Sequence, residues 1–173
     1  MGRLEVSSRR LARALLPAPA RRAVHAGRQT LSDAQQWVFE RRLGISTRGH
    51  LYLEDVGKDA PGAVHYEPCE WLPTRRALRA LRPRPHDVFV DLGSGRGQAL
   101  AIAGLEDYGR VIGVEFVDEL TQDARRNIAA ARPRLRAAQI EAVTAHVLDW
   151  AVPDDLSVVF LYCRSWGCCS IAR

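Results

Sequence analysis

The middle of the chain shows a regular alternation of two hydrophobic patterns. Short apolar runs bounded by turn residues predict strands, and stretches with apolar residues at helical spacing predict helices. In chain order, the expected elements are strand 87 to 92, helix 97 to 105, strand 110 to 116, helix 118 to 131, strand 139 to 147 and strand 157 to 162. Because strands alternate with helices, we expect an α/β domain with a mostly parallel, doubly wound sheet and helices on both faces.

The chain before this alternating part has a helical pattern of its own. Ser32 is a suitable N-cap for a helix that ends at Gly44, and apolar residues recur at helical spacing from Trp71 to Leu81. A short strand at 51 to 53 is expected between these two helices. We therefore predict an N-terminal helical extension in front of the sheet.

Composition and charge place the chain among globular proteins. Its 173 residues are 47% apolar and 26% charged, which suits one domain with a buried core. No apolar run approaches the roughly 20 residues of a membrane span, so we expect a cytoplasmic protein with no membrane partner. The net charge of +5 is carried almost wholly by arginine, which is typical of a GC-rich genome as much as of a protein that binds a polyanion.

Changes in composition divide the chain into four parts. The first 30 residues contain seven arginines, one acid and two prolines, so 1–30 is expected to be a basic, partly disordered extension. A targeting presequence and a contact with nucleic acid are the alternatives for that stretch. The remaining parts are predicted as a helical cap segment at 31–85, a partial α/β domain at 86–162 and an aberrant tail at 163–173.

The cysteines do not form a metal-binding pattern. Three of the four lie in the tail, and no two have the Cys-x-x-Cys spacing of a zinc site, so no metal is expected. The fourth, Cys69, is expected to be a reduced thiol.

The stretch DVFVDLGSGRGQ at 87 to 98 carries the chemistry. An apolar strand reaches Asp91, a turn with glycine at 93, 95 and 97 follows, and a helix begins. The glycines allow the backbone to approach a ligand at the carboxyl edge of the sheet, where open α/β folds bind their ligands. The next strand ends in Glu115, 18 residues after Gly97, where a carboxylate can accept both hydroxyls of a ribose.

Two classes of nucleotide ligand use such a turn. A dinucleotide site has G-x-G-x-x-G, with bare amides facing a pyrophosphate. This turn reads G-x-G-x-G, and Gln98 takes the third dinucleotide glycine position. Asp91 would be poorly placed beside a pyrophosphate, whereas it suits a ligand that carries an ammonium and a sulfonium.

These residues resemble the class I S-adenosylmethionine-dependent methyltransferases. D-L-G-S-G-R-G at 91 to 97 matches the first motif of that family, and V-I-G-V-E-F at 111 to 116 matches its acidic second strand. The likeness to an uncharacterised bacterial branch of the family extends upstream through FERRLGISTRGHLYLEDVG (39 to 57) and VHYEP (64 to 68). A weaker likeness, limited to the glycine turn, links the chain to the non-SET histone-lysine methyltransferases.

The resemblance implies a Rossmann-like fold and S-adenosyl-L-methionine as the cofactor. It assigns Asp91 to the methionine end and Glu115 to the ribose of the cofactor. The backbone of the turn packs against the cofactor at Gly93, Ser94, Gly95 and Gly97. Candidates for the lining of the substrate site are Tyr66, Glu67, Trp71 and Tyr162.

The chain departs from the family pattern at two places. Ala145-His146-Val147 stands where relatives place an Asp that contacts adenine, so His146 or Asp149 is the candidate for that contact. After Tyr162, relatives continue with P-F-x-G and further strands, where this chain reads CRSWGCCSIAR. In the shifted frame, one set of synonymous codons encodes Pro-Phe-Val-Gly, so we predict that the last eleven residues are a frameshift product. C-terminal strands would then be missing, and the apolar edge of strand 157 to 162 would be unpaired.

The sequence thus predicts a methyltransferase that transfers a methyl group to an unknown acceptor, a small molecule or a protein, and that retains only its cofactor-binding half. No catalytic residue is predicted, because the family carries such residues just after the fourth strand. A dinucleotide-dependent oxidoreductase of the NAD type is one alternative. A module that binds the cofactor or nucleic acid without catalysis is the other, and nucleic acid is the less favoured partner.

Overall fold

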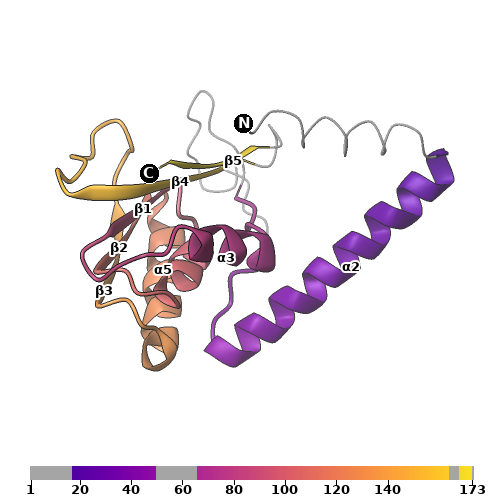
Figure 1. Cartoon of the computed structure of the whole chain (residues 1–173), viewed down its shortest axis with the longest axis horizontal. Helices are drawn as coiled ribbons and strands as arrows, with labels where there is room; N and C mark the ends of the chain where they lie inside the picture. Colours follow the sequence, from indigo (N-terminus) through magenta and orange to yellow (C-terminus); the bar gives the residue numbers. More distant parts are fainter. Residues whose placement is uncertain (1–16, 50–65, 164–167, 173) are drawn as a thin grey trace.

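The computed structural model describes residues 17–49, 66–163 and 168–172, and its centre is a sheet in the order β3-β2-β1-β4-β5 (Figure 1). The first four strands are mutually parallel, and β5 is antiparallel to β4. The strands are β1 (Val88–Leu92), β2 (Arg110–Glu115), β3 (Gln139–Thr144), β4 (Leu156–Cys163) and β5 (Cys168–Ala172). This mostly parallel sheet confirms the predicted Rossmann-like α/β fold class.

Two helices connect the first three strands. Helix α4 (Gln98–Gly104) follows β1 and α5 (Asp118–Ala131) follows β2, within one residue of the predicted bounds. The chain then returns across the sheet so that β4 lies beside β1 rather than beside β3. The strand order therefore reverses between β1 and β4, and ligands of open α/β sheets bind at such a point.

Helices cover one face of this sheet in the part of the chain that the structure describes. Phe89, Val111 and Phe160 pack into one apolar cluster with α3, α4 and α5. Val88, Val90, Ile112 and Val114 form a second cluster, which Trp150 and other residues between β3 and β4 cover. The expectation of helices on both faces is wrong here, because the β3 to β4 connection contains only turns.

The helix before the sheet is longer than the sequence predicted. Helix α2 spans Ala18–Leu43, so Ser32 lies inside it and is not its N-cap. Pro17 and Pro19 stand at its start, where prolines are tolerated, and Gly44 ends it in a left-handed conformation as predicted. The helix leans away from the sheet, and its C-terminal part packs against α3 (Figure 1).

Helix α3 (Trp71–Ala80) confirms the helical pattern before the sheet. The Phe39 ring of α2 stacks on Trp71 with the ring centroids 4.9 Å apart, which fixes the end of α2 against α3. The strand predicted at 51 to 53 lies outside the described residues. Among the helices that the structure describes, none has both the length and the apolar character needed to cross a membrane.

The edge of β4 is paired. β5 runs antiparallel along it from Val159 opposite Ala172 to Cys163 opposite Cys168. The expectation of an unpaired apolar edge at this strand is therefore wrong. Strand β5, which belongs to the tail, forms a ladder of backbone hydrogen bonds with β4. This ladder satisfies backbone N–H and C=O groups of β4 that would otherwise be unpaired at the sheet edge.

Candidate functional site

The glycine turn lies between β1 and α4 and is held by the end of β2. The backbone N–H groups of Gly93 and Ser94 both donate to the carbonyl of Val114, at 2.8 Å and 3.1 Å. Gly93, Gly95 and Gly97 have φ values of 82°, 51° and 80°, a left-handed conformation that side chains disfavour. The backbone conformation of this tight turn at the sheet edge therefore favours glycine at all three positions.

Gly95 also allows a close approach by a distant part of the chain. A Cβ atom at this position would lie 2.1 Å from the ring of Tyr66. The Tyr66 hydroxyl donates to the Thr47 carbonyl at 2.7 Å, and Arg96 lies over the same ring. Burial raises the pKa of the Tyr66 phenol well above its usual value, so the hydroxyl remains a donor.

Asp91 is a buried carboxylate at the carboxyl end of β1. Its exposed fraction is 3%, and no described residue donates a hydrogen bond to its side chain. Burial, and to a smaller extent the nearby charge of Glu115, together raise the pKa of Asp91 from 3.8 to about 8. A cation close to Asp91 would stabilise the ionised form of this buried carboxyl group.

Glu115 is the second buried carboxylate at this edge. One of its oxygens accepts the N–H of Gly95 at 2.9 Å, and the other accepts the N–H of Val117 at 3.0 Å. A carboxylate has about four lone-pair sites, so these two bonds leave acceptor capacity on both oxygens. Glu115 thus ties the glycine turn to β2 and remains able to accept further hydroxyl donors.

A small pocket opens beside Asp91. It is lined by Tyr66, Glu67, Pro68, Cys69, Asp91, Gly93, Ser94, Gln98, Ala99, Phe160 and Tyr162. Among the described residues, the Ser94 hydroxyl is buried here without a hydrogen-bond partner. A buried hydroxyl and a buried carboxylate to which no described residue donates thus line one pocket, and both are groups that a polar ligand could satisfy.

The structure brings three of the four candidates for the substrate lining into this pocket. Tyr66, Glu67 and Tyr162 line it together with Asp91. Trp71 does not line this pocket, and its place in the substrate site stays a prediction. The Trp71 side chain is 2% exposed and stacks on Phe39, because helix α3 turns this apolar ring toward the core.

The candidates for the adenine contact lie outside the pocket. His146 and Asp149 are exposed in the segment after β3. The His146 ring lies edge-on to Phe116 with the centroids 6.4 Å apart, and its Nδ1 atom accepts the N–H of Leu148. His146 follows β3, and Glu115 ends the neighbouring strand β2 at the same edge of the sheet. The contact of His146 or Asp149 with adenine stays a prediction.

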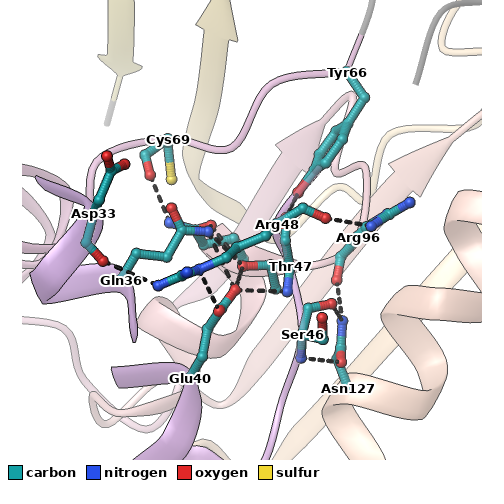
Figure 2. Close-up of polar contacts among 11 residues, drawn as sticks. Asp33, Gln36, Glu40, Ser46, Thr47, Arg48, Tyr66, Cys69, Arg96 and Asn127 are labelled. Carbon is teal, nitrogen blue, oxygen red and sulfur yellow. Dashed lines mark hydrogen bonds and ion pairs between the residues drawn. The ribbon is translucent and has the colours of Figure 1, made fainter. Parts of the chain in front are cut away.

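A polar network that the sequence did not indicate lies against the turn (Figure 2). Residues 45–49, which we call the strap, follow α2 and cross the start of α4. Glu40, Thr47 and Gln98 are buried there, and the Thr47 hydroxyl lies within hydrogen-bond distance of an oxygen of each of the other two. The available signals were the spacing within FERRLGIST and a glutamine in place of glycine at 98, but neither identifies its partner, because the partners are far apart in the sequence.

Comparisons with known proteins give partial matches. No family model matches the chain. An anthranilate synthase of Azospirillum brasilense is 38% identical over 74 residues, which are 42% of this chain and 10% of that protein. A ribosomal RNA small subunit methyltransferase A of Streptomyces avermitilis is 37% identical over 87 residues, which are 49% of this chain and 29% of that protein. The chain therefore matches less than a third of each of these relatives, and their activities differ.

Solved structures of methyltransferases also resemble the chain. An RNA methyltransferase from Salinibacter ruber, in complex with S-adenosyl-L-homocysteine, has a TM-score of 0.48 and 28% identity. The match covers 56% of this chain and 61% of that one. By its sheet order, its glycine turn and its acid at the end of β2, the chain resembles the class I S-adenosylmethionine-dependent methyltransferases.

Proposed function

We propose that the pocket beside Asp91 binds S-adenosyl-L-methionine and that the chain supplies the cofactor-binding part of a methyltransferase. The observation that carries the proposal is the Asp91 carboxylate, buried and without a hydrogen-bond donor among the described residues. Such a group lowers its free energy when a cation approaches it. The cofactor carries an ammonium at its methionine end, and that group is the cation we place near Asp91.

The other groups at the edge fit the same ligand. The backbone of the glycine turn and the unpartnered Ser94 hydroxyl offer hydrogen-bonding groups near Asp91. Glu115 has free acceptor capacity for ribose hydroxyls. When bound, the cofactor supplies a methyl group activated by its sulfonium. The chain's own residues bind and orient it, with residues 86–162 as the binding domain and 31–85 as its cover.

A dinucleotide is a weaker candidate for this pocket. A pyrophosphate would bring negative charge toward two buried carboxylates, Asp91 and Glu115, and no buried lysine or arginine of the described ranges pairs with either of them. The NAD-dependent and the nucleic-acid-binding alternatives therefore enter as outcomes of the test. The methyl acceptor is a separate question that this pocket leaves open.

Isothermal titration calorimetry of the purified chain tests the proposal. S-adenosylhomocysteine, which keeps the ammonium and the ribose, is expected to bind, and NAD is not. The titration is repeated at pH 7 in two buffers that differ in ionisation enthalpy. An ammonium that approaches Asp91 favours the ionised carboxylate, so binding should release protons to the buffer.

The outcomes separate the alternatives. Binding of NAD without S-adenosylhomocysteine contradicts the proposal and favours an oxidoreductase. Binding of S-adenosylhomocysteine without proton release places the ligand away from Asp91. Retention on nucleic acid that falls with salt and disappears on deletion of residues 1–30 would favour the nucleic-acid module instead, provided that S-adenosylhomocysteine does not bind.

A further inference from the structure

The strap is attached to the glycine turn by side chains from four other segments (Figure 2). The backbone N–H of Ser46 donates to the side-chain oxygen of Asn127 in α5, and the backbone carbonyl of Ser46 accepts from the amide of the same side chain. Each of these two bonds is 2.9 Å long. Asn127 also donates to the Arg96 carbonyl inside the turn at 2.9 Å. The backbone carbonyls of Thr47 and Arg48 accept from Tyr66 and from Arg96. The strap therefore has no ladder of its own and depends on these side chains for its position.

Thr47 is the buried centre of this attachment. Its exposed fraction is 0%, and its hydroxyl lies 2.8 Å from a Glu40 oxygen and 2.7 Å from the Gln98 carbonyl oxygen. A hydroxyl has one proton, so it donates to one of these two acceptors at a time. Gln36 contributes an amide donor to all three groups at 3.2 to 3.4 Å. Each buried acceptor therefore has a donor within reach.

Gln98 connects this centre to the ligand pocket. It is the first residue of α4 and follows the glycine turn directly, and its exposed fraction is 2%. While its carbonyl oxygen meets Thr47, its amide nitrogen donates to the Cys69 carbonyl at 2.5 Å. Cys69 and Tyr66 line the same pocket as Asp91. One side chain thus joins the strap, the pocket wall and the helix that starts at the turn.

We propose that Gln98 and Thr47 are positioning residues of the cofactor pocket, which hold residues 66–69 and the strap against the glycine turn so that the wall of the pocket is formed before the ligand arrives. The inference rests on the proposed function, because it describes the same pocket. Neither residue needs to touch the ligand for this role. Their contribution is preorganisation, which lowers the ordering cost of binding.

Two substitutions at Thr47 isolate the hydroxyl. Thr47→Val keeps the volume of the side chain but removes the hydroxyl proton that Gln98 and Glu40 share, whereas Thr47→Ser keeps the hydroxyl. Gln98→Ala removes both bonds of the amide. A matched control is Gln122→Ala, which removes an exposed amide on α5 that bonds only to Asp118 in the described residues.

Binding and exchange are measured in the same set of proteins. Calorimetry with S-adenosylhomocysteine is expected to show an affinity about tenfold lower or worse for Thr47→Val and Gln98→Ala, which corresponds to one lost hydrogen bond of about 1.4 kcal/mol. Thr47→Ser and Gln122→Ala should stay within about threefold of the unchanged chain. Without ligand, amide hydrogen exchange at 45–49 and 66–69 should be faster in the two weak binders and unchanged in β1 and β2.

The possible results are distinct. If the unchanged chain does not bind S-adenosylhomocysteine, the proposed function fails, and this inference fails with it. If the unchanged chain binds and Thr47→Val binds equally well far below its melting temperature, Thr47 has a role in stability alone and the inference is overturned. Should Gln98→Ala not fold, the comparison of Thr47→Val with Thr47→Ser still decides, because Thr47→Ser keeps the hydroxyl and Thr47→Val does not.

Discussion

Two buried carboxylates, 51 residues apart in the sequence, have opposite surroundings. Glu40 is 8% exposed and receives the backbone N–H of Thr47 at 2.7 Å, an amide of Gln36 and the guanidinium of Arg48. Asp91 is 3% exposed and receives no hydrogen bond from the residues that the structure describes. Burial of a charge is costly unless donors compensate it. We infer that Glu40 stabilises the fold, whereas Asp91 is kept for a ligand.

Removal of Glu40 should have the largest effect on stability. Glu40→Ala leaves the backbone N–H of Thr47 without its side-chain acceptor, and it removes the ion pair with Arg48. We expect the free energy of unfolding to fall by about 3 kcal/mol. Urea denaturation measures this loss. Glu119→Ala, at an exposed position in the first turn of α5, is the control and should change it by less than about 0.5 kcal/mol. A loss for Glu40→Ala as small as that of the control would contradict the comparison.

A methyl group at Gly95 should disturb both regions, because this residue lies between them. Gly95→Ala places a Cβ atom 2.1 Å from the Tyr66 ring in a left-handed backbone conformation. The ring must move, which breaks its bond to the strap, so we expect a loss of about 2 kcal/mol and weaker S-adenosylhomocysteine binding.

Gly27→Ala is the matched control for this change. Gly27 lies inside α2 and has no neighbouring atom within 4 Å of an added Cβ. Alanine there should raise stability by up to about 1 kcal/mol through helix propensity. Thermal melting and calorimetry of the two variants give the comparison, and equal effects at both positions would show that Tyr66 does not constrain Gly95.

Neutralisation of Asp91 should separate binding from stability. Asp91→Asn removes the charge that a ligand cation would meet, so the affinity for S-adenosylhomocysteine should fall by about tenfold to a hundredfold. The fold should not be weakened at pH 8, because no donor among the described residues loses its partner. Asp107→Asn, which removes an exposed partner of Arg136, should leave the affinity unchanged. Loss of folding in Asp91→Asn would place Asp91 in the same class as Glu40.

The pH dependence of stability gives the most specific signal. The pKa of Asp91 is raised to about 8 in the folded chain from 3.8. Its contribution to stability is therefore fully present below pH 3.8 and is lost as the pH rises toward and through about 8. The free energy of unfolding of the unchanged chain, minus that of Asp91→Asn, should fall between pH 5 and pH 8 by at most about 1 kcal/mol per unit. Parallel curves in denaturation at these pH values would mean that Asp91 has an ordinary pKa.

The elements of the sheet and the turn were predictable because their signals are local. Apolar runs, helical spacing and the glycines at 93, 95 and 97 reflect requirements that neighbouring residues impose on the backbone. Asp91 and Glu115 could be assigned to one edge because parallel strands end there together. Helix α2 was predicted too short, because a serine such as Ser32 can either cap a helix or lie within one, and the residue type does not distinguish the two.

The sequence by itself determined the order of strands and helices, the left-handed turn and the two acids at the sheet edge, because each depends on residues close together in the chain. Only the tertiary structure decided that Trp71 is buried, that β5 pairs with β4, and that no described residue donates to Asp91 while several donate to Glu40. Contacts such as Thr47 with Gln98, or Ser46 with Asn127, join residues 51 and 81 positions apart. Such contacts depend on how the whole chain packs, and no local pattern of residue types encodes which buried polar group meets which partner.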